Sequence, residues 1–235
     1  MSTFKDEIPR LAEALEGKDP DVILGEIAPR FPRWIALANS FGAEDCVLVD
    51  VIARARLGIE VFTLDTGFLF QETYELWRKL EERYRVEIRA VRPDVPVGAP
   101  VHTWETDPDA CCDLRKVKPL RVALSNLGAW VTGIRRDQTP ERASAKVVEW
   151  DARFGLVKVN PLAAWKSEDV WAYVRRFGVP TNPLHERGYP SIGCAPCTTP
   201  VKIGEDPRAG RWRGREKTEC GLHVDRTGRL VRTGS

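Results

Sequence analysis

The run Trp34-Ile-Ala-Leu-Ala-Asn39, followed by Ser40-Phe-Gly-Ala-Glu-Asp45, decides the fold of this chain. A short apolar run that ends in a glycine-containing turn is typical of a buried strand leading into a helix. Two later runs, Ile59–Asp65 and Ala129–Ile134, have the same form. The sequence therefore predicts several strands that each end at a glycine turn.

Helical patterns lie between these strands. The segments with helical apolar spacing are Lys5–Leu24, Cys46–Ala55, Gln71–Tyr84, Asp109–Ser125 and Ser167–Phe177. Ser167 is the predicted N-cap of the last helix, and Pro119 is a possible interruption of the fourth. Further strands are expected at Val86–Val91 and Leu156–Asn160. Alternating strands and helices predict an α/β fold, a mostly parallel twisted sheet flanked by helices.

Three regions are expected along the chain. Residues 1–30 form an N-terminal helical segment, residues 31–199 form the α/β domain, and residues 200–235 form a mobile, loop-rich C-terminal tail. The tail carries two Lys and seven Arg against five Asp or Glu. This local excess of positive charge fits either a small anionic ligand or a solvated tail.

The overall composition excludes several classes of protein. The chain has 235 residues, of which 43% are hydrophobic and 30% charged, so it has enough apolar content for a core. No apolar run approaches the length that spans a bilayer, and the charged N-terminus does not resemble a secretory signal. We therefore expect a cytoplasmic protein with no membrane partner. The net charge of +2 gives no general case for nucleic acid binding.

The glycine turns are candidate sites for an anionic ligand. Ligands of parallel sheets bind at the carboxyl ends of the strands, where glycine lets backbone N–H groups approach them. The candidate binding residues are Ser40, Gly42, Leu64, Thr66, Gly67 and Gly133. None of the turns ends in the Gly-Lys-Ser/Thr of a Walker loop. The same glycines also suit a purely structural role, because tight turns need them.

Cysteine usage is the most informative feature of the composition. The six cysteines are Cys46, Cys111, Cys112, Cys194, Cys197 and Cys220. In a reducing compartment, clustered cysteines more often bind metal or do chemistry than form disulfides. Cys46 lies in an apolar run and is expected in the core. The adjacent pair and the Cys-x-x-Cys suit zinc or an iron–sulfur cluster, or are buried or transiently oxidised thiols.

The surroundings of the adjacent pair favour ionised thiols. Asp107 is a predicted N-cap, so Cys111 and Cys112 lie in the first turns of a helix, where the dipole stabilises thiolates. Helical spacing places Arg115 and Lys116 one turn further on. Adjacent cysteines are awkward ligands for one tetrahedral zinc ion and suit a larger metal–sulfide cube.

Cys220 lies in the basic tail, in Lys217-Thr-Glu-Cys220-Gly-Leu-His223. Basic neighbours and a nearby histidine lower the pKa of a thiol and make it nucleophilic, whereas Glu219 acts in the opposite direction. A lone cysteine in a tail is more often inert, so the residues alone leave both readings open.

Together these features resemble the assimilatory adenosine 5′-phosphosulfate (APS) reductases, within the wider family of phosphoadenosine-phosphosulfate (PAPS) reductases. The resemblance runs from about Trp34 to His223. It rests on Cys-Cys-x-x-Arg-Lys at 111–116, Cys-x-x-Cys at 194–197 and Lys-Thr-Glu-Cys-Gly-Leu-His at 217–223. Leu64-Asp-Thr-Gly and Thr132-Gly-Ile-Arg-Arg-Asp add support. The resemblance implies a fold like that of the adenine nucleotide alpha hydrolases, which is Rossmann-like.

The resemblance also implies an activity and its residues. The activity is thioredoxin-dependent reduction of APS to sulfite and AMP in sulfate assimilation, through an S-sulfonated Cys220. The implied cofactor is one [4Fe–4S] cluster held by Cys111, Cys112, Cys194 and Cys197. Lys116 and His223 would assist catalysis, and Arg208 and Arg211 would bind the substrate with the glycine turns. Thioredoxin or a similar thiol donor is the implied partner.

Several alternatives stay open from the sequence. The substrate is APS, PAPS or both, and a homo-oligomer is compatible with the sequence. An ATP pyrophosphatase is a rival, although its usual Ser-Gly-Gly-x-Asp-Ser loop is missing. A zinc-binding nucleic-acid module that uses the basic tail is a rival of another class. Many relatives carry Ser-Phe-Ser-Gly in the first loop, whereas this chain has Phe41 in place of the second serine.

Overall fold

Six strands form one sheet in the order β3-β2-β1-β4-β6-β5. Their bounds are β1 Ile35–Ala38, β2 Glu60–Leu64, β3 Ile88–Val91, β4 Ala129–Val131, β5 Val148–Asp151 and β6 Leu156–Val159. All neighbours are parallel except β5, which runs antiparallel to β6 at one edge. The computed structural model describes residues 2–95, 103–215, 217 and 219–222. The predicted mostly parallel sheet is confirmed.

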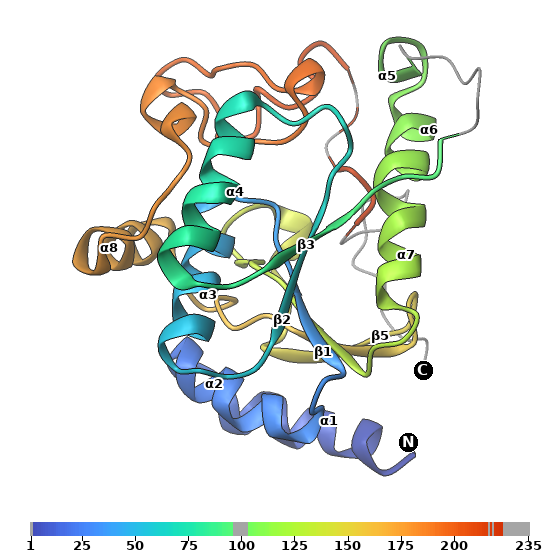
Figure 1. Cartoon of the computed structure of the whole chain (residues 1–235), viewed down its shortest axis with the longest axis vertical. Helices are drawn as coiled ribbons and strands as arrows, with labels where there is room; N and C mark the ends of the chain where they lie inside the picture. Colours follow the sequence, from blue (N-terminus) through green and yellow to red (C-terminus); the bar gives the residue numbers. More distant parts are fainter. Residues whose placement is uncertain (1, 96–102, 216, 218, 223–235) are drawn as a thin grey trace.

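Helices cover both faces of this sheet (Figure 1). Their bounds are α1 Ser2–Leu15, α2 Pro20–Ile27, α3 Ala43–Arg54, α4 Gln71–Tyr84, α5 Thr103–Thr106, α6 Pro108–Cys112, α7 Lys118–Leu124 and α8 Ser167–Phe177. Helices α3, α4 and α8 lie on one side of the sheet, and α6 and α7 lie on the other. Within the described residues, no helix has both the length and the apolar character to cross a membrane.

Two hydrophobic cores correspond to the two faces. Successive side chains of a strand point to opposite sides, so Leu37 and Val131 join the core beneath α1–α4 and α8. Ala36 and Trp130 instead pack with Leu120 of α7. Apolar residues of α1 and α2 belong to the first core, so the N-terminal helices and the sheet share one interior.

Some predicted boundaries are wrong for local reasons. The predicted helix Lys5–Leu24 is two helices, because Gly17 takes a φ of +70° and Pro20 begins α2. Ser167 is the first residue of α8, and the N-cap is Lys166, whose backbone N–H donates to the Asp169 carboxylate at 2.8 Å. The edge strand β5 has no counterpart among the predicted strands.

Helices α6 and α7 are joined by a π turn at Asp113–Val117. In this turn the N–H of Lys118 donates to the carbonyl of Asp113, five residues back. A proline ring clashes with the carbonyl four residues earlier in an α-helix, and the wider π turn relieves that clash for Pro119. The predicted helix Asp109–Ser125 is therefore interrupted just before this proline.

The order of the strands creates a crevice. The chain leaves β1 toward β2 and β3 on one side and later returns to place β4 and β6 on the other. Loops that follow β1 and β4 therefore diverge at the carboxyl edge of the sheet. Such a switch point is where open α/β sheets bind ligands.

Candidate active site

A cavity of about 590 Å³ opens at this switch point, which is an ordinary size for a small-molecule site. Of the residues predicted to catalyse or bind substrate, it is lined by Ser40, Gly42, Leu64, Thr66, Lys116, Gly133, Arg208, Arg211 and Cys220. Gly67 is not part of the lining; its φ of +76° shapes the turn after β2. His223 lies outside the described residues. The structure thus brings together side chains that are far apart in the sequence.

Asp45 holds the turns after β1 and β4 together. Its carboxylate accepts hydrogen bonds from the Ser40 N–H at 2.7 Å and the Ser40 hydroxyl at 2.6 Å, and from the Gly133 N–H. Burial raises the pKa of Asp45 to about 6. A Cβ at Gly133 would lie 2.3 Å from an Asp45 carboxylate oxygen, so only glycine lets the two turns approach this closely.

The side chain of Phe41 is part of the hydrophobic core. Its side chain is buried and stacks on Trp77 at a centroid distance of 5.6 Å. Its backbone takes a φ of +62°, and its N–H donates to the side-chain carbonyl of Asn39 at 2.7 Å. Phe41, which stands where many relatives have serine, therefore adds apolar packing to the core.

Cys220 lines the same cavity and lies close to cations. Burial by itself raises the pKa of this thiol, but Lys116 and Arg211 lower it, and the result lies below the ordinary value. Burial lowers the pKa of Lys116, but the thiolates of Cys194 and Cys220 raise it more, so the ammonium stays charged. The thiolate form of Cys220 and the ammonium of Lys116 thus stabilise each other.

The four predicted metal ligands lie in a separate cavity, where burial, unlike the cations near Cys220, dominates the pKa of the adjacent pair Cys111 and Cys112. Cys111, Cys112, Cys194 and Cys197 line a second, small cavity together with Phe68, Trp104 and Trp212. Burial raises the pKa of Cys111, and it raises that of Cys112 to about 12, so it outweighs the predicted effect of the helix start. Arg115 and Lys116 oppose this shift.

The donor set of this second cavity fits a cluster better than a single ion. Among the described residues, no three His, Cys, Asp or Glu side chains are grouped closely enough for one metal ion. All four cysteines are nonetheless unpaired thiols around one apolar cavity. An iron–sulfur cube takes one thiolate at each of four separate irons, so its ligands need not converge on one point.

The segment that follows the Cys-x-x-Cys lines both cavities, the larger one through Arg211 and the smaller one through Trp212. Thr198 forms a bridge with Arg211, and the Trp212 N–H donates to the Cys197 carbonyl at 3.0 Å. A Cβ on Gly193 would lie 2.4 Å from the Arg211 guanidinium, so this glycine lets the guanidinium lie against the backbone. The loop that carries Cys194 and Cys197 is therefore in direct contact with the segment that carries Arg211 and Trp212.

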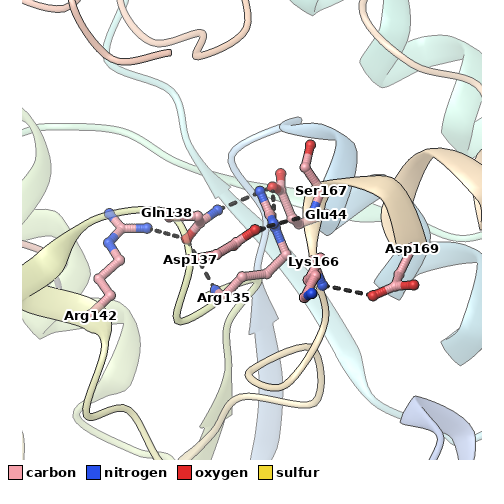
Figure 2. Close-up of polar contacts among 8 residues, drawn as sticks. All are labelled: Glu44, Arg135, Asp137, Gln138, Arg142, Lys166, Ser167 and Asp169. Carbon is pink, nitrogen blue, oxygen red and sulfur yellow. Dashed lines mark hydrogen bonds and ion pairs between the residues drawn. The ribbon is translucent and has the colours of Figure 1, made fainter. Parts of the chain in front are cut away.

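Three further residues that line the cavity, Gln138, Arg142 and His185, were not among the predicted site residues. Arg142 and Gln138 belong to a network that also includes Glu44 and Arg135 (Figure 2). They follow the Thr132-Gly-Ile-Arg-Arg-Asp motif, and that proximity is the signal that points to them. His185 accepts no protein donor at its buried Nε2 among the described residues, and its Nδ1 lies 2.9 Å from the Tyr189 carbonyl. An isolated histidine in a loop gives no comparable signal.

Comparison with known proteins agrees with this site. A sequence profile described as "Phosphoadenosine phosphosulfate reductase domain" matches residues 34–200. An adenosine 5′-phosphosulfate reductase of Halalkalibacterium halodurans is 44% identical, with 92% of this chain and 96% of that protein covered. A phosphoadenosine 5′-phosphosulfate reductase of Gloeobacter violaceus is 43% identical, with 95% and 96% covered.

A solved structure extends the agreement to the fold. The PAPS reductase of Candida auris, in complex with phosphate, superposes with a TM-score of 0.75 at 28% identity. The match covers 83% of this chain and 97% of that one. The expected fold of the adenine nucleotide alpha hydrolase kind is confirmed. The profile, the relatives and the fold lead to one conclusion: the chain belongs to the phosphoadenosine phosphosulfate reductase family.

Proposed function

We propose that this protein is an APS reductase, which converts APS to sulfite and AMP with electrons from a thioredoxin-like dithiol. The observation that carries the proposal is the position of Cys220. This thiol, whose pKa lies below its ordinary value, lines a nucleotide-sized cavity beside Lys116 and Arg211. Several relatives at 42–49% identity bear the name adenosine 5′-phosphosulfate reductase.

In the first step the Cys220 thiolate attacks the sulfur of the APS sulfonate. A sulfur–sulfur bond forms, the bond from that sulfur to the phosphate oxygen breaks, and AMP leaves with the electron pair. The turns that carry Ser40 and Gly133, which line the same cavity, bind the nucleotide. Lys116 and Arg211 offset the negative charge that develops on the departing phosphate, an electrostatic role that is often a large part of catalysis.

In the second step a thiolate of thioredoxin attacks the Cys220 sulfur. Sulfite leaves with the bonding electrons, a mixed disulfide forms, and the second thioredoxin thiol resolves it. The two electrons come from the donor dithiol, which ends as a disulfide. Cys220 is partly exposed, so it is placed to meet a partner once AMP has departed.

We assign a [4Fe–4S] cluster to Cys111, Cys112, Cys194 and Cys197, because these thiols share one apolar cavity. When bound, the cluster supplies a net negative charge near the substrate-binding cations. Lys116 lines both cavities, so its ammonium lies between the cluster ligands and the substrate. His223 is the remaining predicted catalytic residue, and its role stays a prediction, as do a cytoplasmic location and thioredoxin as the donor.

The test is to incubate the anaerobically purified enzyme with APS in the absence of reductant. Mass spectrometry is expected to find one sulfonate added to Cys220, with release of one AMP. Cys220→Ser is the matched control; it should retain iron and AMP binding and form no adduct. An adduct on another residue, or turnover by Cys220→Ser, would contradict the proposal. Parallel incubation with PAPS measures how far the 3′-phosphate is accepted.

A further inference from the structure

We propose that Glu219 is a positioning residue, which latches the C-terminal segment through Arg142 so that Cys220 is held over the cavity. This inference rests on the proposed function of Cys220. It assigns a role to a carboxylate that the two chemical steps above do not use.

The latch is a buried ion pair between residues far apart in the chain. Arg142 donates to Glu219 through Nε at 3.1 Å and through Nη2 at 2.9 and 3.1 Å. Arg208 adds a contact from its Nη2 at 3.2 Å. The side chains of Glu219 and Arg142 are only 5% and 8% exposed. Charge-assisted, multidentate pairs of this kind fix geometry more firmly than a single bond.

The other end of the latch is anchored in the nucleotide-binding turns. Arg142 also donates to the side-chain oxygen of Gln138 at 2.6 Å. Gln138 in turn accepts from the Arg135 backbone N–H at 3.1 Å and donates to Glu44 at 3.1 Å. Figure 2 shows these side chains converging between the turn after β4 and the start of α3. Glu219, which directly precedes Cys220, is therefore linked through Arg142 and Gln138 to the turns that bind the nucleotide.

Electrostatics exclude activation of the thiol as the reason for Glu219. Its carboxylate is one of the influences that raise the pKa of Cys220, so its charge opposes formation of the nucleophile. Burying a carboxylate is also costly unless it is paired. Glu219 is paired with two arginines, which offset the cost of its burial, and it lies next to the reactive thiol, so its role is to position Cys220.

The experiment measures two properties of Cys220 in the iron-loaded enzyme: its sulfonation by APS without reductant, and its alkylation by iodoacetamide without nucleotide. Glu219→Gln should slow sulfonation by about tenfold to a hundredfold, as expected when a reacting atom is misplaced by about 1 Å. Alkylation of Cys220 should become faster in this variant, because the thiol is less confined and no longer has a negative charge next to it. Glu205→Gln removes the carboxylate of an exposed ion pair with Arg213 in the same segment and should change neither rate.

Arg142→Gln separates the two causes of faster alkylation, since it breaks the latch and keeps the charge of Glu219. We expect faster alkylation and slower sulfonation here as well, and no additional loss in the double variant Arg142→Gln/Glu219→Gln. Iron content should stay at the wild-type value in all variants, and AMP affinity should stay at the wild-type value in Glu219→Gln. Unchanged sulfonation in Glu219→Gln, unchanged alkylation in Arg142→Gln, or parallel loss of iron and AMP binding in Glu219→Gln would overturn the inference. If the wild type forms no adduct, the proposed function fails, and alkylation still tests the latch.

Discussion

Replacing Gly133 with alanine tests whether close approach of the two turns is required for nucleotide binding. The added Cβ would lie 2.3 Å from an Asp45 carboxylate oxygen and 2.9 Å from the Glu44 Cβ, whereas ordinary contacts begin at 3.4 Å. One of the turns must move by about 1 Å, and Asp45 then loses its bond from Gly133 or those from Ser40. A hydrogen bond to a charged group contributes about 1.5–3 kcal/mol, so AMP should bind roughly tenfold to a hundredfold more weakly.

The assay is calorimetric titration of AMP into the iron-loaded protein. Gly25→Ala is the matched control, because a Cβ at that helical position meets nothing within 4 Å. The control should bind AMP normally and gain about 0.5–1 kcal/mol of stability from the helix propensity of alanine. If Gly133→Ala binds AMP as tightly as the control, the two turns do not form the nucleotide site in the way described.

Two further predictions concern charge. Lys116→Met removes a cation that lowers the pKa of Cys220 against the effect of burial, so alkylation of Cys220 should require a higher pH. Lys118→Met, at an exposed lysine two residues further on, is the control, and coincident pH profiles of Lys116→Met and the control would contradict the reasoning. Burial raises the pKa of Asp45 from 3.8 to about 6, so the folded state binds a proton more readily than the unfolded chain. The free energy of unfolding should therefore increase by up to about 3 kcal/mol as the pH falls through this range. Asp45→Asn should abolish this increase. The measurement is the unfolding free energy of the wild type and of Asp45→Asn as a function of pH, and a difference between them that stays constant with pH would refute the raised pKa of Asp45.

Patterns along the chain predicted those parts of the fold that are determined locally. Gln71–Tyr84 is helical at the predicted bounds, because its apolar residues follow the period of a helix that buries one face. The strands that end in glycine turns were equally visible, because each is a short apolar run. Asp107 caps α6 as predicted, with its carboxylate accepting from Asp109 and Ala110.

Contacts between distant segments were not predictable in this way. Arg142 and Glu219 are 77 residues apart, and nothing in either neighbourhood indicates the other. The edge strand β5 is stabilised by pairing with β6 and by packing against α1, and its own sequence, Val148–Asp151, is only half apolar. The interruption of the helix near Pro119 was predicted, whereas its form as a π turn at Asp113–Val117 was not.

The π turn between α6 and α7 has a consequence for changes in chain length. Before it, Cys111 and Cys112 face the small cavity; after it, Leu120 and Leu124 face the sheet. Each residue advances a helix by about 100°, so deleting one residue between these pairs would rotate one face away from its target. A deletion or insertion in this segment should therefore disturb the site more than the exchange of an exposed side chain such as Lys118.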